Sequence, residues 1–370
     1  MSLYYTNEKR TKKKGVIVMD QTKKCRQIDK ETFSYRIPKD REFRILQLTD
    51  LHLGFGVLSR RKDQMAMKAV TTIIKKSKPD IIILTGDSIF PFLPKSGTMN
   101  NRKQAKKLTA FMDHFQIPYA IVMGNHDAEM GASCKKEELM DLFAAGKYSI
   151  CTKGRADITG IGNYFILLQQ ESETDEKKEA DTVLALALLD SNMYGDGWFY
   201  SGFDCIHKDQ TDWCMKRLDR LREKSPALEA LAFFHMPPQE FKDAYEKMKL
   251  GDEHIQYHFG SIAEPGEFFG ISTKKGTFFK EAVRNGMIKG MFCGHDHLNT
   301  ISLTYQGIRL TYGMSIDYLG YKGIENKYTQ RGGTLITRSV NGTIRVKPVP
   351  LSRVVSTEIH GVKKSRKERR

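Results

Sequence analysis

The sequence predicts an α/β fold in which helices cover a largely parallel β-sheet. Short, wholly apolar runs such as Ile81-Ile82-Ile83-Leu84 alternate with segments of helical periodicity. Such runs are typical of strands buried on both faces, and their alternation with helices is typical of a sheet that helices cover. At 370 residues with 40% hydrophobic content, the chain is long enough for one large domain or two ordinary ones.

The first half of the chain gives these elements in a regular order. A strand is expected at 44–48, and apolar residues at helical spacing from 66 to 74 predict a helix that ends by Pro79. The strand at 81–84 follows, then a polar helix around 102–115 and, after Pro118, a strand at 119–123. This alternation of strands and helices is what predicts the parallel sheet.

The second half adds shorter elements. Strands at 164–168 and 183–189 flank a charged loop and are expected to form a hairpin, and a helix at 209–223 leads to a strand at 230–234. Residues 239–285 are irregular and rich in Gly, His and aromatic residues, which suits a lid or wall over a site. A strand at 287–293 is followed by short strands over 300–348, with turns at Gln306-Gly307 and Asn341-Gly342.

The net charge of +16 lies mostly at the two ends of the chain. Residues 1–30 hold nine basic and three acidic residues, and residues 361–370 hold six and one, which leaves only +5 for the rest. Basic runs at termini are usually solvated, so nucleic-acid binding is compatible with this charge but not indicated by it. We expect a basic extension with a short β-hairpin over 1–40, the main domain over 41–350, and a basic, disordered tail over 351–370.

The cysteines and the hydropathy pattern bear on location. The six cysteines are scattered and form no CxxC pair, which favours free thiols in a reducing compartment over a disulfide framework. No run approaches the roughly 18 apolar residues that a membrane-spanning helix needs, and the N-terminus does not resemble a secretory signal. We therefore expect a cytoplasmic protein, and the sequence does not indicate its oligomeric state.

Seven candidate metal ligands follow the apolar strands, each beside a glycine or a polar turn. Because loops at the carboxyl ends of neighbouring strands converge on one crevice, we expect these side chains to meet there. Imidazole mixed with carboxylate suits two ions of Mn, Fe or Zn rather than calcium or a thiolate site. The candidates are Asp50, His52, Asp87, Asn125, His235, His295 and His297.

These residues belong to five blocks that occur in order along 50–297. They are Asp50-Leu51-His52, Gly86-Asp87, Gly124-Asn125-His126-Asp127, the single His235, and Gly294-His295-Asp296-His297. The pattern resembles that of the calcineurin-like metallophosphoesterase superfamily, in the branch similar to the small relatives of purple acid phosphatases. The resemblance implies a four-layer fold of two packed mixed β-sheets flanked by helices, and a hydrolase that acts on a phosphate ester.

The resemblance also implies a role for each residue. The first metal would be held by Asp50, His52, Asp87 and His297, and the second by Asp87, which bridges, with Asn125, His235 and His295. A hydroxide that bridges the two metals would attack phosphorus. His126 would act as the general acid that protonates the leaving group, and Asp127 would orient His126.

Some features leave the activity open. Purple acid phosphatases carry a metal-binding Tyr three residues after the bridging Asp, and here that position is Phe90, so a site without the purple colour is expected. A phosphomonoesterase is favoured, with a phosphodiesterase acting on cyclic nucleotides or other diesters as the alternative and a nuclease as a weaker one. A non-catalytic metal-binding scaffold would be a different class, but it predicts a lost ligand or a replaced His126, and neither is found.

Overall fold

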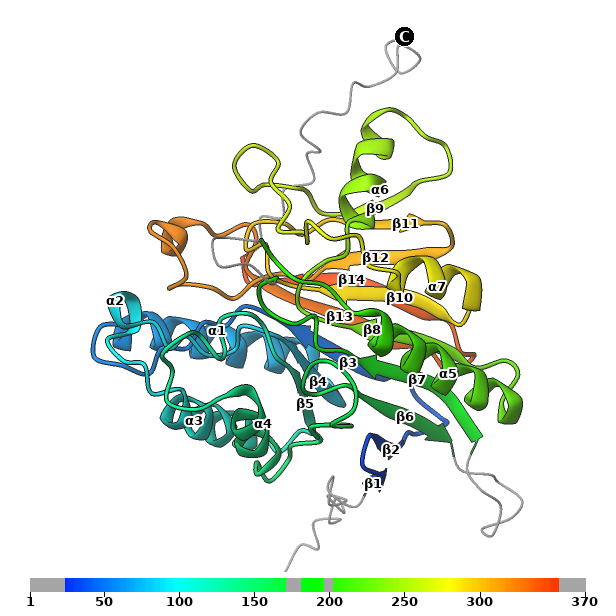
Figure 1. The fold of residues 1–370 in the computed structure, drawn as a ribbon, viewed down its shortest axis with the longest axis horizontal. Coiled ribbons are helices and arrows are strands. Elements are labelled where there is room, and N and C mark those ends of the chain that lie inside the picture. Colours follow the sequence, from blue (N-terminus) through cyan, green and yellow to red (C-terminus); the bar gives the residue numbers. More distant parts are fainter. Residues whose placement is uncertain (1–23, 171–180, 196–201, 353–370) are drawn as a thin grey trace, which may run out of the picture.

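Two β-sheets pack face to face in this protein, and helices cover the outer face of each (Figure 1). The computed structural model describes residues 24–170, 181–195 and 202–352. Both sheets contain parallel and antiparallel pairs. The α/β fold of two packed mixed sheets flanked by helices is therefore confirmed.

A five-stranded sheet forms one half of the sandwich. Its order is β14-β13-β3-β4-β5, with β3, β4 and β5 parallel and the hairpin β13–β14 antiparallel to β3. The strands are β3 (Phe43–Leu48), β4 (Ile81–Thr85), β5 (Tyr119–Val122), β13 (Gly332–Arg338) and β14 (Ile344–Pro350). The outer face is covered by the helices α1 (Arg60–Ser77), α3 (Asn101–Asp113) and α4 (Lys136–Ala144).

A nine-stranded sheet forms the other half, in the order β1-β2-β6-β7-β8-β10-β12-β11-β9. The strands are β1 (Cys25–Asp29), β2 (Thr32–Arg36), β6 (Tyr164–Gln170), β7 (Asp181–Leu188), β8 (Glu229–Phe233), β9 (Gln256–Phe259), β10 (Ile288–Cys293), β11 (Ser302–Tyr305) and β12 (Ile308–Tyr312). Its outer face packs against the helices α5 (Lys208–Lys224), α6 (Glu240–Lys249) and α7 (Phe278–Asn285).

The apolar runs are strands because both of their faces are buried. In β4, Ile81 and Ile83 lie in the core between the two sheets, while Ile82 and Leu84 lie in the core under the helices. Successive side chains of a strand point to opposite faces, so a strand between two apolar layers must be apolar at every position. The helix α1 then ends where predicted, with Lys78 in the left-handed region and Pro79 directly after it.

The predicted hairpins are confirmed, and two other predictions need correction. β6 pairs with β7, β11 with β12 and β13 with β14, all antiparallel. Residues 239–285 are more regular than predicted, because they contain α6, β9 and α7. The expected N-terminal extension is partly integrated into the fold, since β1 and β2 form a hairpin and β2 pairs in parallel with β6.

Three expectations fall on parts of the chain that the structure does not describe. They are residues 1–23 of the basic extension, the charged loop over 171–180, and the basic tail from 353 onward. The domain boundaries at 40 and 350 remain predictions.

Candidate metal centre

The structure brings all seven candidate ligands together at the carboxyl ends of β3, β4, β5, β8 and β10. Their side chains follow these strands directly, and each of the five strands is parallel to at least one neighbour within its sheet. Three overlapping groups of His and Asp have ligand atoms within 4.8 Å of one another. These groups are Asp50, His52 and His297; His52, Asp87 and His126; and Asp87, His235 and His295.

The first group lies where the loop after β3 meets the loop after β10. His297 Nε2 is 3.6 Å from Asp50 Oδ1, and His52 Nε2 is 3.5 Å from Asp87 Oδ2. The other Asp50 oxygen accepts a hydrogen bond from the Thr49 hydroxyl at 2.8 Å. Asp50 and His52 are buried and His297 nearly so, which means that their geometry is fixed by the protein rather than by water.

Asp317 completes this group, and the sequence did not indicate it. Its Oδ2 lies 2.9 Å from His297 Nδ1, and its Oδ1 lies 3.7 Å from His52 Nδ1. The same Oδ1 accepts hydrogen bonds from the backbone N–H of Leu319 at 2.6 Å and of Gly320 at 2.7 Å. A buried carboxylate on the far nitrogen of a ligand histidine fixes the ring and raises its basicity. One carboxylate therefore faces two candidate ligands.

The charges explain the protonation of this group. Burial alone would lower the pKa of His297, but the carboxylates of Asp317 and Asp50 outweigh it and raise that pKa to about 10. Burial would likewise raise the pKa of Asp317, but His52 and His297 lower it below its usual range. Both shifts favour the charged forms, so His297 and Asp317 form an ion pair.

Asp87 lies between the two halves of the centre. Its Oδ2 is 3.5 Å from His52 Nε2 and 3.1 Å from His235 Nε2, and its Oδ1 accepts the backbone N–H of His126 at 2.8 Å. Burial would raise its pKa, but the imidazoles of His235 and His126 lower it well below the ordinary value. The carboxylate thus faces both His52 and His235.

The second half contains Asn125, His235 and His295. His235 Nδ1 donates to the Thr85 carbonyl at 2.9 Å, which directs Nε2 toward Asn125 Oδ1 at 3.2 Å and His295 Nδ1 at 3.3 Å. Burial would lower the pKa of His235, but Asp87 outweighs it and raises that pKa to about 9. For His295, burial and the neighbouring His235 together lower the pKa well below its usual value, so this ring is neutral.

Four of the candidate ligands have strained backbones. Asp50, His52, Asp87 and His295 have φ angles of 51°, 46°, 48° and 77°, in the left-handed region. Such conformations cost on the order of 1–3 kcal/mol each in residues with a side chain, and they cluster at functional sites. The strained turns aim the side chains inward immediately after each strand.

Two glycines make room for the same turns. A Cβ on Gly124 would lie 2.1 Å from Asp87 Oδ1, and a Cβ on Gly86 would lie 2.4 Å from the His235 ring. Gly86 also has a φ of 89°, which favours glycine. The glycines that the sequence places before Asp87 and Asn125 are therefore needed for close approach as well as for the turn.

His126 differs from the candidate ligands in its exposure. Its side chain is 29% exposed, and its Nδ1 pairs with the carboxylate of Glu129. The ring contacts Phe90 at 5.0 Å between centroids. His126 therefore lies at the open side of the centre, with Glu129 holding its far nitrogen.

The contacts of Asp127 do not support its predicted role of orienting His126. The Asp127 carboxylate accepts backbone hydrogen bonds from Gly124 at 2.8 Å, Asp87 at 3.1 Å and Ile89 at 3.0 Å. Within the described part of the chain, the His126 ring is paired with Glu129 and not with Asp127. It ties the loop after β5 to the loop after β4. Since the next residue along a tight turn faces the other way, Glu129 at i+3 reaches the ring instead.

Further loops form walls around the centre. A Cβ on Gly270 would lie 2.5 Å from the His295 ring, and a Cβ on Gly320 would lie 2.7 Å from the His297 ring. The Asp296 carboxylate accepts hydrogen bonds from Gly270 N and from the Tyr312 hydroxyl, so it fixes one wall. Gly270 belongs to the segment 239–285, from which a lid or wall over the site was expected, and it packs against the His295 ring.

The residues present fit bound metal ions. Both ring nitrogens of His52 and Asp87 Oδ2 are buried and have no hydrogen-bond partner among the residues described. A buried polar atom without a partner costs roughly 1–3 kcal/mol, which a metal–ligand bond would offset. The donors are imidazole nitrogens and carboxylate or amide oxygens, the set expected for Mn, Fe or Zn.

A comparison with protein families agrees with this geometry. The calcineurin-like phosphoesterase family matches residues 43–299, from the first residue of β3 to just after the last candidate ligand. The chain belongs to this family. Asp317 lies outside the matched region.

Individual relatives are similar over most of this phosphoesterase. "Probable inactive purple acid phosphatase 29" of Arabidopsis thaliana is 28% identical over 304 residues, which cover 76% of this chain and 73% of the relative. "Phosphatase DCR2" of Saccharomyces cerevisiae is 28% identical over 294 residues, which cover 74% of this chain and 47% of the relative. The resemblance to purple acid phosphatase relatives that the sequence suggested is confirmed.

A solved structure shares the fold. The crystal structure of a dimetal phosphatase from Danio rerio aligns with a TM-score of 0.51 and 11% sequence identity, over 85% of this chain and 98% of that chain. At this identity the likeness supports the four-layer fold alone.

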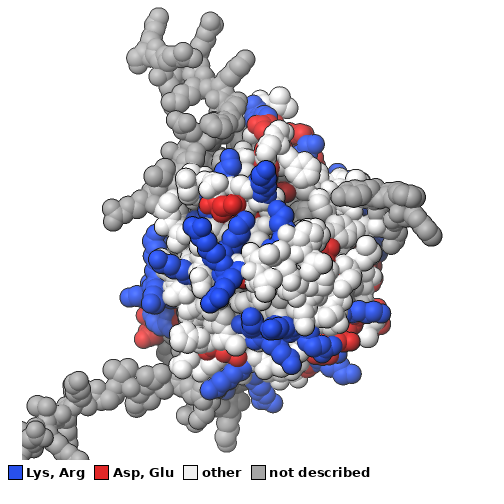
Figure 2. All heavy atoms as spheres, turned by 90° about the vertical axis from the view of Figure 1, so that its left-hand side faces the viewer, with Lys and Arg blue, Asp and Glu red and all other residues white. Residues whose placement is uncertain are grey.

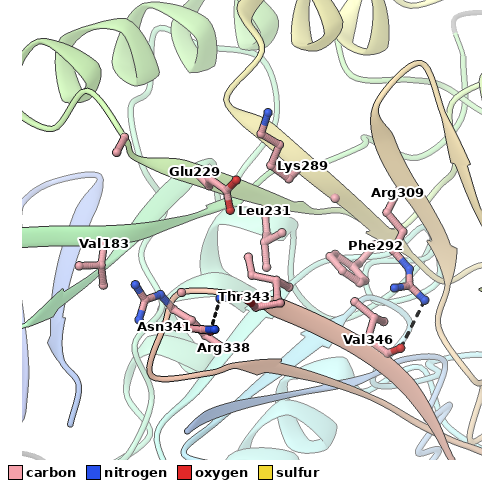
Figure 3. Close-up of a pocket in the computed structure, with 14 residues that line it drawn as sticks. Val183, Glu229, Leu231, Lys289, Phe292, Arg309, Arg338, Asn341, Thr343 and Val346 are labelled. Atoms are coloured by element: carbon pink, nitrogen blue, oxygen red, sulfur yellow. Dashed lines mark hydrogen bonds between the residues drawn. The ribbon is translucent and has the colours of Figure 1, made fainter. Parts of the chain in front are cut away.

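A cavity of about 590 Å³ lies elsewhere in the phosphoesterase, near the amino ends of β8 and β10 and against the hairpin β13–β14 (Figure 3). Arg309 and Arg338 lie on opposite sides of it, with Glu229 and Lys289 between them. None of the seven candidate ligands lines it. The candidate ligands therefore lie at the opposite, carboxyl ends of these strands.

Proposed function

We propose that this phosphoesterase hydrolyses phosphomonoesters with two metal ions held by the seven candidate ligands. The observation that carries the proposal is the position of Asp87, whose single carboxylate lies within 3.5 Å of His52 Nε2 and 3.1 Å of His235 Nε2. Two ions that share a carboxylate are the arrangement found in many hydrolases of phosphate esters.

Each half of the centre would hold one ion. Asp50, His52, Asp87 and His297 form the first ligand set, and Asp87, Asn125, His235 and His295 form the second. Bound there, two ions of Mn, Fe or Zn would neutralise the charge of a phosphate ester and supply an activated water as the nucleophile. The protein's part is to hold the ester in line with that water and to exclude bulk solvent with the walls at Gly270 and Gly320.

His126 would protonate the leaving-group oxygen. Glu129 holds the proton on Nδ1 and stabilises the imidazolium, which leaves Nε2 to give its proton to the departing oxygen. The partial exposure of His126 suits this role, because the group must meet the substrate and then regain a proton from water.

The choice between monoester and diester is part of the proposal. Relatives carry the name phosphatase, which supports a monoester. A diester remains the second candidate, because the same ligands serve both reactions and specificity depends on the side chains beside them, such as Phe90 and Tyr194. Phe90 contacts the rings of both His52 and His126, and the Tyr194 hydroxyl accepts a hydrogen bond from Asn125 Nδ2 at 3.1 Å.

A catalytically silent scaffold is the alternative from another class. Three of the plant relatives are named as inactive, which favours it for those proteins. In this chain the complete ligand set and the paired His126 and Glu129 favour an enzyme. A protein that had lost catalysis would have no use for a hydrogen-bonded proton donor beside the ligands.

Hydrolysis assays test the proposal. Protein loaded separately with Mn, Fe or Zn is incubated with p-nitrophenyl phosphate and with bis-p-nitrophenyl phosphate, and metal content is measured by mass spectrometry. We expect two metals per chain and faster release from the monoester. Faster release from the diester would favour the second candidate, and two bound metals without turnover of either would favour the scaffold. His254→Ala, an exposed histidine with no contact to the centre, is the matched control.

Two finer proposals go with this function. Phe90 stands where purple acid phosphatases have a metal-binding Tyr, so oxidised, iron-loaded protein should lack a violet absorbance band, and such a band would contradict the proposed ligands. We also propose a cytoplasmic location, which the six free cysteines support. Among the described residues, no helix has the length and apolar character needed to cross a membrane.

A further inference from the structure

Exposed apolar side chains gather beside the metal centre. Val57 and Leu58 are 84% and 63% exposed, Leu93 is 57% exposed at the start of the short helix α2 (Leu93–Ser96), and Met130 is 94% exposed. We call Val57, Leu58, Leu93 and Met130 the apolar rim. Exposed aliphatic residues scattered singly need no explanation, but neighbouring ones mark interaction sites.

The contacts of the backbone place these residues together. Leu58 N donates to the Ser96 carbonyl at 3.3 Å, so the loop before α1 is bound to α2. A Cβ on Gly97 would lie within 3.0 Å of both the Val57 and Leu58 side chains. The loop that carries Met130 is joined to the same region through Ser133 N, which donates to the Met99 carbonyl at 3.0 Å.

The apolar rim is continuous with the metal centre. The Phe92 ring is 5.7 Å from the Phe90 ring, and Phe90 in turn is 4.9 Å from the His52 ring and 5.0 Å from the His126 ring, between centroids. Met130 directly follows Glu129, the partner of His126. The rim therefore borders the side from which a substrate must enter.

Basic side chains surround the rim. Arg60 and Arg61 are exposed at the start of α1, Lys95 lies on α2, and none of the three forms an ion pair with a residue that the structure describes. Exposed Lys322 and Lys327 lie around the 3₁₀ turn Ile324–Asn326, which Lys62 of α1 joins through an ion pair with Glu325 at 3.5 Å.

The figures place this charge on one face. α2 and the start of α1 are at the left of Figure 1, and Figure 2 shows that side from the front, with blue side chains gathered across its middle and lower half beside an uncharged area. Red side chains are fewer there. This face thus carries many basic side chains next to an uncharged area.

We propose that the apolar rim and its basic border dock on an anionic membrane surface. The aliphatic side chains would enter the headgroup region while Arg60, Arg61 and Lys95 contact anionic headgroups, the combination that binds peripheral proteins to membranes. Docking in this orientation turns the mouth of the metal centre toward the lipid. The substrate would then be a phosphate ester held at the membrane surface. This part of the proposal rests on the proposed function.

Charge and shape favour a membrane over other occupants. The residues that dominate binding energy in protein interfaces are most often Trp, Tyr and Arg in buried pockets, whereas the four residues of the rim have no aromatic ring and are exposed. A second copy of the chain would bring the same positive charge against itself, because a symmetric interface pairs a patch with its own copy. An anionic surface complements both features at once.

Vesicle cosedimentation tests the proposal with the full chain. We compare phosphatidylcholine vesicles with vesicles in which part of the lipid is phosphatidylserine, for the wild type, for Val57→Ser/Leu58→Ser/Leu93→Ser, and for the control Leu250→Ser. Leu250 is 87% exposed and lies after α6, away from the rim. The basic termini are the same in all three proteins, so a difference between the variants reports on the rim.

We expect the triple variant to lose about tenfold or more in binding to the anionic vesicles, and the control to bind as the wild type does. Release of p-nitrophenol should be the same in all three proteins, which separates docking from catalysis. Equal vesicle binding by the triple variant and the control would overturn the proposal. A second result would also overturn the proposal. If light scattering showed that the wild type and the control are dimers and the triple variant is a monomer, the rim would be an interface between two copies of the chain.

Discussion

The two halves of the metal centre are supported in different ways. In the half with Asp50, His52 and His297, the far nitrogens of both histidines face the single carboxylate of Asp317. In the half with Asn125, His235 and His295, the far nitrogen of His235 donates to a backbone carbonyl instead. Asp87 lies between the halves.

The difference concerns charge. The first half contains Asp50 and Asp317 beside Asp87, whereas the second adds only neutral donors to Asp87. More negative charge attracts a cation more strongly, and a carboxylate behind a histidine raises its basicity. We infer that the first half binds its ion more tightly and that the ion of the second half exchanges first. The following variants test this comparison.

Asp87→Asn should have the largest effect, because it removes the carboxylate that the two halves share. We expect the loss of both metals and turnover no higher than that of metal-free protein. Metal analysis after dialysis, with the p-nitrophenyl phosphate assay, measures both. Retention of two metals per chain would mean that Asp87 is not a shared ligand.

His126→Ala should leave both halves filled and still slow the reaction. Loss of a general acid costs about 10²–10⁴-fold in turnover, and more for a poor leaving group such as an alkyl oxygen than for p-nitrophenolate. The check is the ratio of turnover numbers on the two esters at constant metal content. If metal content falls instead, His126 is a ligand and not the acid.

Asp317→Asn should affect one half only. Loss of a carboxylate behind ligand histidines typically costs about 10–100-fold in metal affinity. We expect dialysis against a weak chelator to leave one metal per chain. Asp204→Asn is the matched control, since Asp204 also binds a histidine, His207, but away from the centre. Loss of both metals together would contradict independent support of the halves.

Glu129→Gln should have the smallest effect on the centre. A hydrogen bond to a charged group is worth about 1.5–3 kcal/mol, so turnover should fall by about 10- to 150-fold while metal content stays at two. Asp127→Asn serves as the contrast. The Asp127 carboxylate accepts hydrogen bonds from three backbone N–H groups, so this substitution should lower the melting temperature rather than turnover alone. An Asp127 variant with normal stability and a selective loss of turnover would restore its predicted role as the partner of His126.

Local patterns predicted much of the fold. The runs at 44–48, 81–84 and 119–123 became β3, β4 and β5. The runs at 81–84 and 119–123 contain no charged or amide residue, because a strand between two apolar layers buries both of its faces. Residues 239–285 were misjudged, since their composition hid the short helical stripe of Phe278, Phe279 and Ala282 in α7. A helix of eight residues gives too few turns for the periodicity to stand out.

The sequence by itself determined the candidate ligands and the order of the strands that present them. Each ligand directly follows an apolar strand, and parallel strands end at the same edge of a sheet, so a linear pattern was enough. Glu129 could have been found in the same way, since it lies three residues after His126, but the sequence offers the nearer Asp127 first.

Only the tertiary structure decided the place of Asp317. After β12 the chain crosses to the other sheet, where Ile316 N donates to the Thr49 carbonyl at 3.1 Å and Ser315 lies beside Thr49, next to Asp50. This contact joins residues more than 250 positions apart, and no local periodicity encodes it. Long-range packing also forms the apolar rim, whose members come from the loop before α1, the short helix α2 and the loop after β5. Side chains that meet through long-range packing carry no spacing that a sequence can display.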